Sequence, residues 1–187
     1  HETQWDGRPT LIGGFDTGYT HGGDKCILTI AKVGQAQRQG RDGPILIKVV
    51  DIIHQIAIDQ NMKVAQSKEE QVTRKLLEIL KKPEFAEPKD SYPLTIGNIA
   101  LDVTGGGNIS PLIRRDIGEP FRVNFKSKPS DKVVSLTDKR KGTDRFITLR
   151  DQMWIVPRGL IRSEQLKGFT SEMIRQACAC RFDLSDR

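Results

Sequence analysis

The residues from Pro9 to Val33 constrain the fold most, because they form two apolar runs joined by a glycine-rich turn. The first run ends at Asp16, and Asp24 opens the second run, which is rich in Ile, Leu and Val. Apolar, β-branched runs on either side of a glycine-containing bend are typical of a β-hairpin. Aspartate is a poor strand former, so two carboxylates around this bend need a reason. Either the turn itself favours aspartate, or the pair holds a hard cation.

The remaining elements alternate in an order typical of an α/β domain with a mixed sheet. With 187 residues, the chain is long enough for a single domain over residues 1–187 with its own core. After a frayed entry over residues 1–8, strands are expected at 9–15, 25–33, 44–53 continuing toward 58, 94–103, 121–125 and 178–184. Helices are expected at 66–82, 110–117, 143–154 and 171–177, with a flexible polar loop at 34–43 and a basic irregular connector at 126–142.

Two of the expected helices have informative ends. Ser67 and Glu70 have the S-x-x-E spacing of a capping box, and Pro83 is expected to stop the helix that follows. The helix over 143–154 is expected to break before Pro157. Met153 and Trp154 near its end are predicted to belong to the core.

Charge is concentrated in one part of the chain. The net charge is +6, and the segment from Arg114 to Arg150 alone holds eleven basic and five acidic residues. A localised basic field favours a polyanionic partner. No apolar run approaches the roughly 18–20 residues of a membrane span, so no membrane segment is predicted. The three cysteines lack metal-type spacing and are interpreted as reduced, which favours a cytoplasmic setting.

A second apolar strand also ends in an aspartate, at Asp102, with Gly105–Gly107 just after it. If the first and fourth strands lie side by side, Asp16 and Asp102 meet at one edge of the sheet. Clustered carboxylates without His or Cys suit Mg²⁺ or Mn²⁺. Carboxylates beside a basic surface are typical of two-metal phosphodiester hydrolysis, in which one ion activates water and the other stabilises the leaving oxygen.

Four stretches in this order resemble a known family: FDTGYTHGGDKCILTI, ALDVTGGGN, RVNFKSKPSDK and FITLRDQMWIVPRGLI. They are similar to the C-terminal nuclease domain of the large terminase subunit of tailed bacteriophages, over about Leu11 to Leu184. The resemblance implies an RNase H-like fold and an endonuclease that cuts concatemeric viral DNA during genome packaging. It also implies double-stranded DNA, the ATPase motor, the portal and the small terminase subunit as partners, and the host cytoplasm as location.

The resemblance implies roles for single residues. Asp16 would bind both metal ions and Asp102 one of them, while Asp24 would be an accessory ligand. The family carries a third acidic ligand in a motif like S-P-D-x-x-D-A, which residues 1–187 lack, so that ligand is expected beyond Arg187. The ATPase motor is likewise not expected within these residues, because they contain no G-x-x-x-x-G-K-[ST] motif.

Basic side chains near the third motif are candidates for phosphate contacts that position DNA without reading its sequence. They are Lys126, Lys128, Lys132, Arg140 and Lys141. Two alternatives stay open beside the packaging nuclease. One is another RNase H-like enzyme, related to resolvases or transposases, and the other is a catalytically incomplete DNA-binding module.

Overall fold

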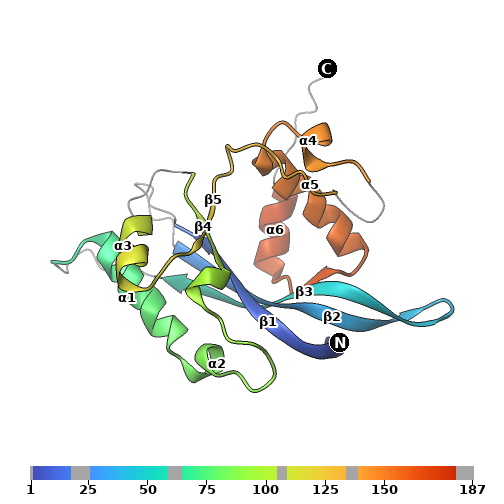
Figure 1. The fold of residues 1–187 in the computed structure, drawn as a ribbon, viewed down its shortest axis with the longest axis horizontal. Coiled ribbons are helices and arrows are strands. Elements are labelled where there is room, and N and C mark those ends of the chain that lie inside the picture. The colour runs from blue at the N-terminus through green and yellow to red at the C-terminus, as the bar shows by residue number, and fades with distance from the viewer. Residues whose placement is uncertain (1, 18–25, 59–64, 105–108, 134–138, 180–187) are drawn as a thin grey trace.

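A six-stranded mixed sheet organises the chain, with helices on both of its sides (Figure 1). The computed structural model describes residues 2–17, 26–58, 65–104, 109–133 and 139–179. The strands are β1 (Trp5–Asp16), β2 (Cys26–Gly40), β3 (Gly43–Ile58), β4 (Ile99–Asp102), β5 (Phe121–Val123) and β6 (Leu166–Lys167). The helices are α1 (Lys68–Leu80), α2 (Pro83–Ala86), α3 (Ile109–Asp116), α4 (Gly142–Arg145), α5 (Leu149–Arg162), α6 (Ser171–Ala179) and the 3₁₀ turn η1 (Ile96–Asn98).

The strand order is β5-β4-β1-β2-β3-β6, which confirms the predicted α/β class with a mixed sheet. The first three strands form an antiparallel meander, as predicted. β4 pairs parallel with β1, β5 parallel with β4, and β6 parallel with β3. The predicted strand at 94–103 is shorter than expected, because η1 occupies its first half.

The β2–β3 hairpin is longer than the sequence predicts. Strand pairing continues from Cys26↔Ile58 to Gly40↔Gly43, so only Arg41 and Asp42 form the turn. The predicted flexible loop at 34–43 was therefore wrong, apart from its turn. The frayed entry predicted at 1–8 was wrong for residues 5–8, since β1 already begins at Trp5. Polar side chains do not prevent strand formation in an outer ribbon, where cross-strand partners satisfy the backbone groups.

One face of the sheet carries the main core. Burial alternates along β1, with Leu11, Gly13 and Phe15 buried, because successive side chains point to opposite faces. The predicted capping box starts α1, since Glu70 N–H donates to Ser67 Oγ and Glu70 accepts from Ser67 N–H. The core contains the following buried side chains from the sheet and from α1, α2 and α3: Leu11, Phe15, Leu28, Ile30, Val72, Leu76, Ile79, Phe85, Ile99, Leu101, Ile109 and Ile113. Each large apolar side chain buried there contributes about 1.5–3 kcal/mol.

Helix α5 connects the two edges of the sheet. Its first residues donate backbone hydrogen bonds to the segment after β5, from Leu149 N to Ser127 O at 2.9 Å and from Arg150 N to Phe125 O at 3.1 Å. Beyond its end, the chain enters β6 at the opposite edge. The fourteen residues of α5 span about 21 Å and the five gaps between six strands about 24 Å, so the helix covers most of this crossing and residues 163–165 complete it before β6.

Helix boundaries in the last third of the chain differ from the prediction. α5 starts at Leu149, where Thr148 Oγ1 accepts from Asp151 N–H, and it continues through Pro157 to Arg162. A proline inside a helix removes one backbone donor and its ring crowds the carbonyl four residues earlier, at a cost of about 3 kcal/mol, so α5 forms despite Pro157. The predicted strand at 178–184 was wrong at its start, because α6 extends to Ala179, and residues 180–184 lie outside the described part.

In the residues that the structure describes, no helix has the length and apolarity needed to cross a membrane.

Gly168, directly after β6, allows a test of how closely β6 packs on β3. Its φ is +79°, and an added Cβ would lie 2.0 Å from the carbonyl oxygen of Ile52. Gly168→Ala should therefore lower the free energy of unfolding by at least about 2 kcal/mol, from backbone strain and overlap. Gly159 is the matched control, because it lies exposed within α5 with nothing within 4 Å of its added Cβ.

Gly159→Ala should raise the free energy of unfolding by up to about 1 kcal/mol, since alanine is the better helix former. Urea unfolding of both variants followed by circular dichroism measures the two effects. Equal stability of the Gly168→Ala variant and the unchanged protein would contradict the described packing of β6 on β3.

Candidate functional site

Two predicted site residues end neighbouring strands. β1 and β4 pair parallel with Gly13↔Ile99, Gly14↔Ala100 and Phe15↔Leu101, and the next residues along the two strands are Asp16 and Asp102. Adjacent strands lie about 4.8 Å apart, so the two aspartates are backbone neighbours at the same level of the sheet. The predicted adjacency of the first and fourth strands is confirmed.

Both aspartates lie on the face of the sheet opposite the main core. Phe15 and Leu101, one residue earlier, are buried at 2% and 0% exposure. Asp16 is exposed and Asp102 half-buried, as the alternation of strand side chains requires. The two carboxylates therefore share one face and meet solvent there.

A groove of about 370 Å³ opens above these strand ends. Gly14 and Ala100 lie two residues before the aspartates and line the groove, so the sheet presents small side chains beside the carboxylates. The lining includes residues of five strands, of the segment after β5 and of α5: Gly14, Phe15, Asp16, Ile27, Thr29, Gln55, Ala100, Asp102, Val123, Phe125 and Met153. A Cβ added at Gly14 would meet nothing within 4 Å, so the space above this position is open.

The carboxylate of Asp102 is held by the segment that follows it. Its Oδ1 accepts a hydrogen bond from the backbone N–H of Thr104 at 2.7 Å. The Thr104 hydroxyl oxygen in turn accepts from the N–H of Phe125 at 2.8 Å, and Val103 N–H donates to Val123 O at 2.9 Å. The first bond restricts the orientation of the Asp102 side chain, and the other two connect the end of β4 with the end of β5.

The other predicted acidic ligands are not described. Asp24 lies in residues 18–25, outside the described part of the chain, and residues 1–187 contain no motif like S-P-D-x-x-D-A for the expected third ligand. Within the described ranges, no three His, Cys, Asp or Glu side chains gather closely enough to hold a metal ion. Asp16 and Asp102 are therefore the described members of the predicted ligand set.

Sequence reasoning missed the contribution of α5 to this site. Met153 and Trp154 were predicted to be core residues, and this was wrong, because they are 49% and 45% exposed. Together with Arg150 they occupy i, i+3 and i+4 of one helix, a spacing that places side chains on a common face. They line a second groove of about 470 Å³ with Asp102 and Phe125. The sequence spacing indicated a shared helix face, but not which neighbour that face meets.

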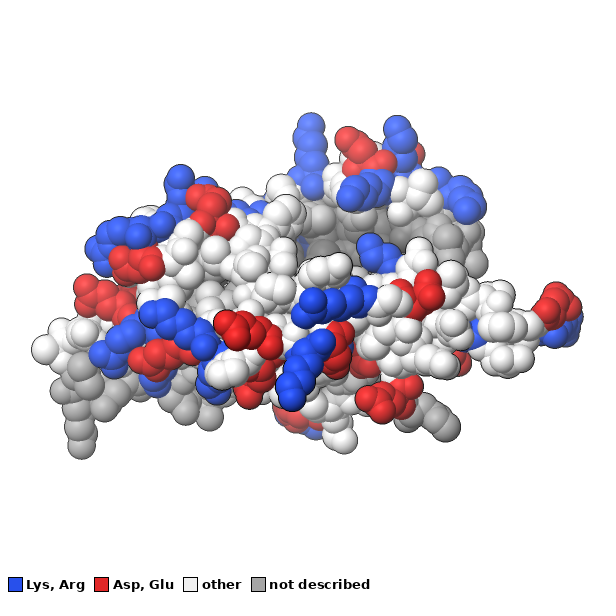
Figure 2. Space-filling model, turned by 60° about the horizontal axis from the view of Figure 1, so that its bottom comes forward, with Lys and Arg blue, Asp and Glu red and all other residues white. Residues whose placement is uncertain are grey.

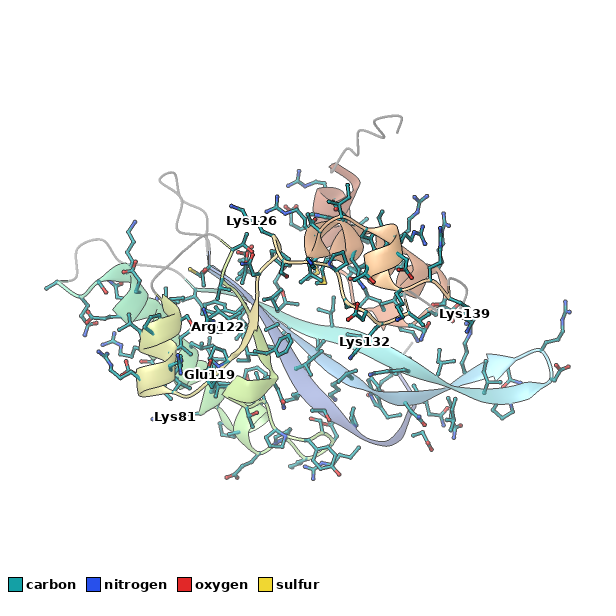
Figure 3. All side chains as sticks on the ribbon, turned by 45° about the horizontal axis from the view of Figure 1, so that its top comes forward. Lys81, Glu119, Arg122, Lys126, Lys132 and Lys139 are labelled. Carbon is teal, nitrogen blue, oxygen red and sulfur yellow. The ribbon has the colours of Figure 1, made fainter. Side chains whose placement is uncertain are left out.

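The five basic residues predicted to contact DNA are all exposed. Lys132 and Lys141 come close together, since Val133 forms a bridge with Lys141 and Gly142 N–H donates to Lys132 O at 3.0 Å. Figure 3 shows Lys126, Lys132 and Lys139 at separate points along the segment between β5 and α4. The structure therefore distributes these cations along a path after β5 and does not gather them at one point.

Part of the basic segment is neutralised locally. Arg114 forms an ion pair with Glu119, and Arg115 binds Asp116 through two hydrogen bonds of 2.6 and 2.9 Å. The hydrogen bond from Arg115 lowers the pKa of the Asp116 carboxyl, and the same contact raises the pKa of the guanidinium. On the face in Figure 2, positive and negative side chains are interspersed. The excess charge of the segment therefore comes from the residues after β5 more than from α3.

Comparisons of the chain with protein-family models, with curated proteins and with solved structures found no match.

The hydroxyl oxygen of Thr104 accepts the hydrogen bond from Phe125 N–H, and a substitution can remove this oxygen. Thr104→Val keeps the side-chain shape but leaves the Phe125 N–H without its acceptor, and should lower the free energy of unfolding by about 1 kcal/mol. Thr104→Ser keeps the hydroxyl and should retain most of the stability. Denaturant titration of both variants tests this, and a Val variant as stable as the Ser variant would contradict the described hydrogen bond.

Proposed function

We propose that the chain is a metal-dependent DNA endonuclease that hydrolyses phosphodiester bonds. The observation that carries this proposal is the pair of aspartates at neighbouring strand ends, on an open face beside a groove. Two carboxylates converging beside a basic surface match the requirements of metal-assisted phosphoryl chemistry better than those of acyl transfer, which needs a nucleophile with a base.

The topology supports an RNase H-like fold for this enzyme. The strands follow the order β3-β2-β1-β4-β5, with the first three antiparallel and β4 and β5 parallel to β1. Helices α1 and α3 pack on one face and contact each other. The resemblance implies an RNase H-like fold with an aspartate on its first and on its fourth strand, and Asp16 and Asp102 end β1 and β4 here.

Asp16 and Asp102 provide oxygen ligands suited to Mg²⁺ or Mn²⁺. Both are accessible from the groove, and the Asp102 carboxylate is already oriented by Thr104. When bound there, divalent cations supply Lewis acidity that activates water and stabilises the departing oxygen. We expect Asp24 to join Asp16 and Asp102 in the carboxylate set.

Other parts of the chain would bind and position the DNA. The small side chains of Gly14 and Ala100 leave room for a sugar–phosphate backbone to approach the carboxylates. The exposed cations Lys126, Lys128 and Lys132 follow the end of β5 and would contact phosphates without reading bases. Lys141, which forms a bridge with Val133, and the preceding Arg140 would extend that contact.

The sequence resemblance suggests the biological setting. We propose that this nuclease cuts concatemeric viral DNA during genome packaging in the host cytoplasm. Its partners would be double-stranded DNA, the ATPase motor, the portal and the small terminase subunit. A relative of resolvases or transposases, or a DNA-binding module without catalysis, remains the alternative outcome of the tests.

Supercoiled plasmid offers a direct test of the nuclease. In the presence of Mn²⁺ the protein should nick plasmid, and chelator should abolish the nicking. Asp16→Asn and Asp102→Asn should each slow nicking by more than about 100-fold. Losing a group that only orients a metal ligand already costs up to about 100-fold, and these two residues are proposed to bind the metal directly. Asp42→Asn, at the exposed tip of the β2–β3 hairpin, is the matched control and should leave the rate unchanged.

Nicking that survives both substitutions would overturn the assignment of the site. Plasmid binding without metal-dependent nicking would favour the DNA-binding module, and in that case affinity should still fall steeply with salt through counterion release.

Gly14 allows the groove to be filled without disturbing the fold. Gly14→Val adds a side chain where nothing lies within 4 Å of the new Cβ, and valine suits a strand better than glycine. The variant should therefore be as stable as the unchanged protein, or more so, yet nick plasmid at least about tenfold more slowly. Gly14→Ala is the graded control, with a smaller loss. Thermal unfolding and plasmid nicking measure the two properties, and full activity of the Val variant would contradict a substrate path over Gly14.

A further inference from the structure

The second groove beside Asp102 has a chemistry that cutting a regular duplex does not need. It is lined by Asp102, Phe125, Arg150, Met153 and Trp154. Two aromatic rings, a thioether and a guanidinium thus lie within one groove next to a predicted metal ligand. Phosphate contacts with duplex DNA use cations and backbone donors, and they gain nothing from aromatic faces.

The aromatic side of this groove is anchored to the sheet. Phe125 N–H donates to Thr104 Oγ1, and Phe125 O accepts from the N–H of Arg150 at 3.1 Å. Phe125 therefore bridges the end of β4, through Thr104, to the first turn of α5. Because Arg150, Met153 and Trp154 occupy i, i+3 and i+4 of that helix, the aromatic and cationic groups are held at one position relative to Asp102.

The exposure of these residues points to a ligand. Trp154 remains 45% exposed and Met153 49% exposed, although both line a concave surface. Large apolar groups that gather at an open groove are typical of binding sites. Arg150 brings positive charge to the same groove. None of the ion pairs found within the described ranges involves Arg150. An anionic ligand with a flat, stackable face satisfies both features.

We propose that this groove binds an unpaired nucleotide next to the phosphate that is cut. Its base would stack on Trp154 and Phe125, its phosphate would pair with Arg150, and Met153 would pack against the sugar. This inference rests on the proposed nuclease function and narrows its substrate to DNA that is single-stranded or frayed at the site of cleavage. Stacking of one base on an aromatic side chain changes affinity by roughly 5- to 150-fold.

Intrinsic fluorescence provides a local test, because the chain has two tryptophans and Trp5 lies at the start of β1. In a Trp5→Phe background, Trp154 is the single reporter. With chelator present, a single-stranded oligonucleotide should quench its fluorescence with saturation, whereas a blunt duplex of equal length and heparin should not. Trp154→Ala should weaken binding of the single strand by roughly 5- to 150-fold, and Trp154→Phe by much less.

Ile155→Ala is the matched control, since Ile155 is the next residue of α5, is 39% exposed and does not line this groove. It should bind the single strand as the unchanged protein does. Equal affinity of the Trp154→Ala variant and the control, with both folded by circular dichroism, would overturn the proposal. Equal quenching by duplex and single strand would also overturn it.

The outcome separates this inference from the proposed nuclease. The fluorescence titration contains no metal, so it does not depend on cleavage. Metal-dependent nicking together with unchanged affinity of Trp154→Ala would reject the nucleotide groove alone. Quenching by single strands together with no nicking under any metal would reject the nuclease and retain the groove.

Discussion

The parallel pairing of β1 with β4 is the interaction on which the described site depends. It joins residues more than eighty positions apart in the chain, and it brings two strand ends to one level of the sheet. The crossover through α1 makes this pairing possible, because a parallel neighbour cannot be reached by a tight turn. The same crossover places α1 and α2 on one face, where α3 joins them after β4, so the aspartates are left on the other face.

Helix α5 turns that open face into a groove. Its start is tied to the segment after β5 by backbone hydrogen bonds, and its end leads into β6 at the far edge. The side chains of α5 therefore face the carboxylates across a gap and do not complete a second core. This accounts for the half-exposed Met153 and Trp154, which a helix packed tightly on the sheet would bury.

Local chemistry explains which features were predictable. The capping box of Ser67 and Glu70, the apolar runs of the meander and the strand ending at Asp102 depend on neighbours in the sequence, and each was predicted from it. The polar outer part of the β2–β3 hairpin was missed, since its pairing depends on the partner strand and not on its own polarity. The start of α5 was predicted too early, at residue 143, although Thr148 and Asp151 form a local capping box that begins the helix at Leu149.

By itself, the sequence determined that Asp16 and Asp102 end apolar strands before glycine-containing turns, and that positive charge follows the second of them. It also determined that Arg150, Met153 and Trp154 share a helix face, through the period of the α-helix. Only the tertiary structure decided that the two aspartates lie side by side and that this helix face borders Asp102. Strand pairing and helix docking join residues distant in the chain, and no local pattern of side chains specifies which distant surfaces will meet.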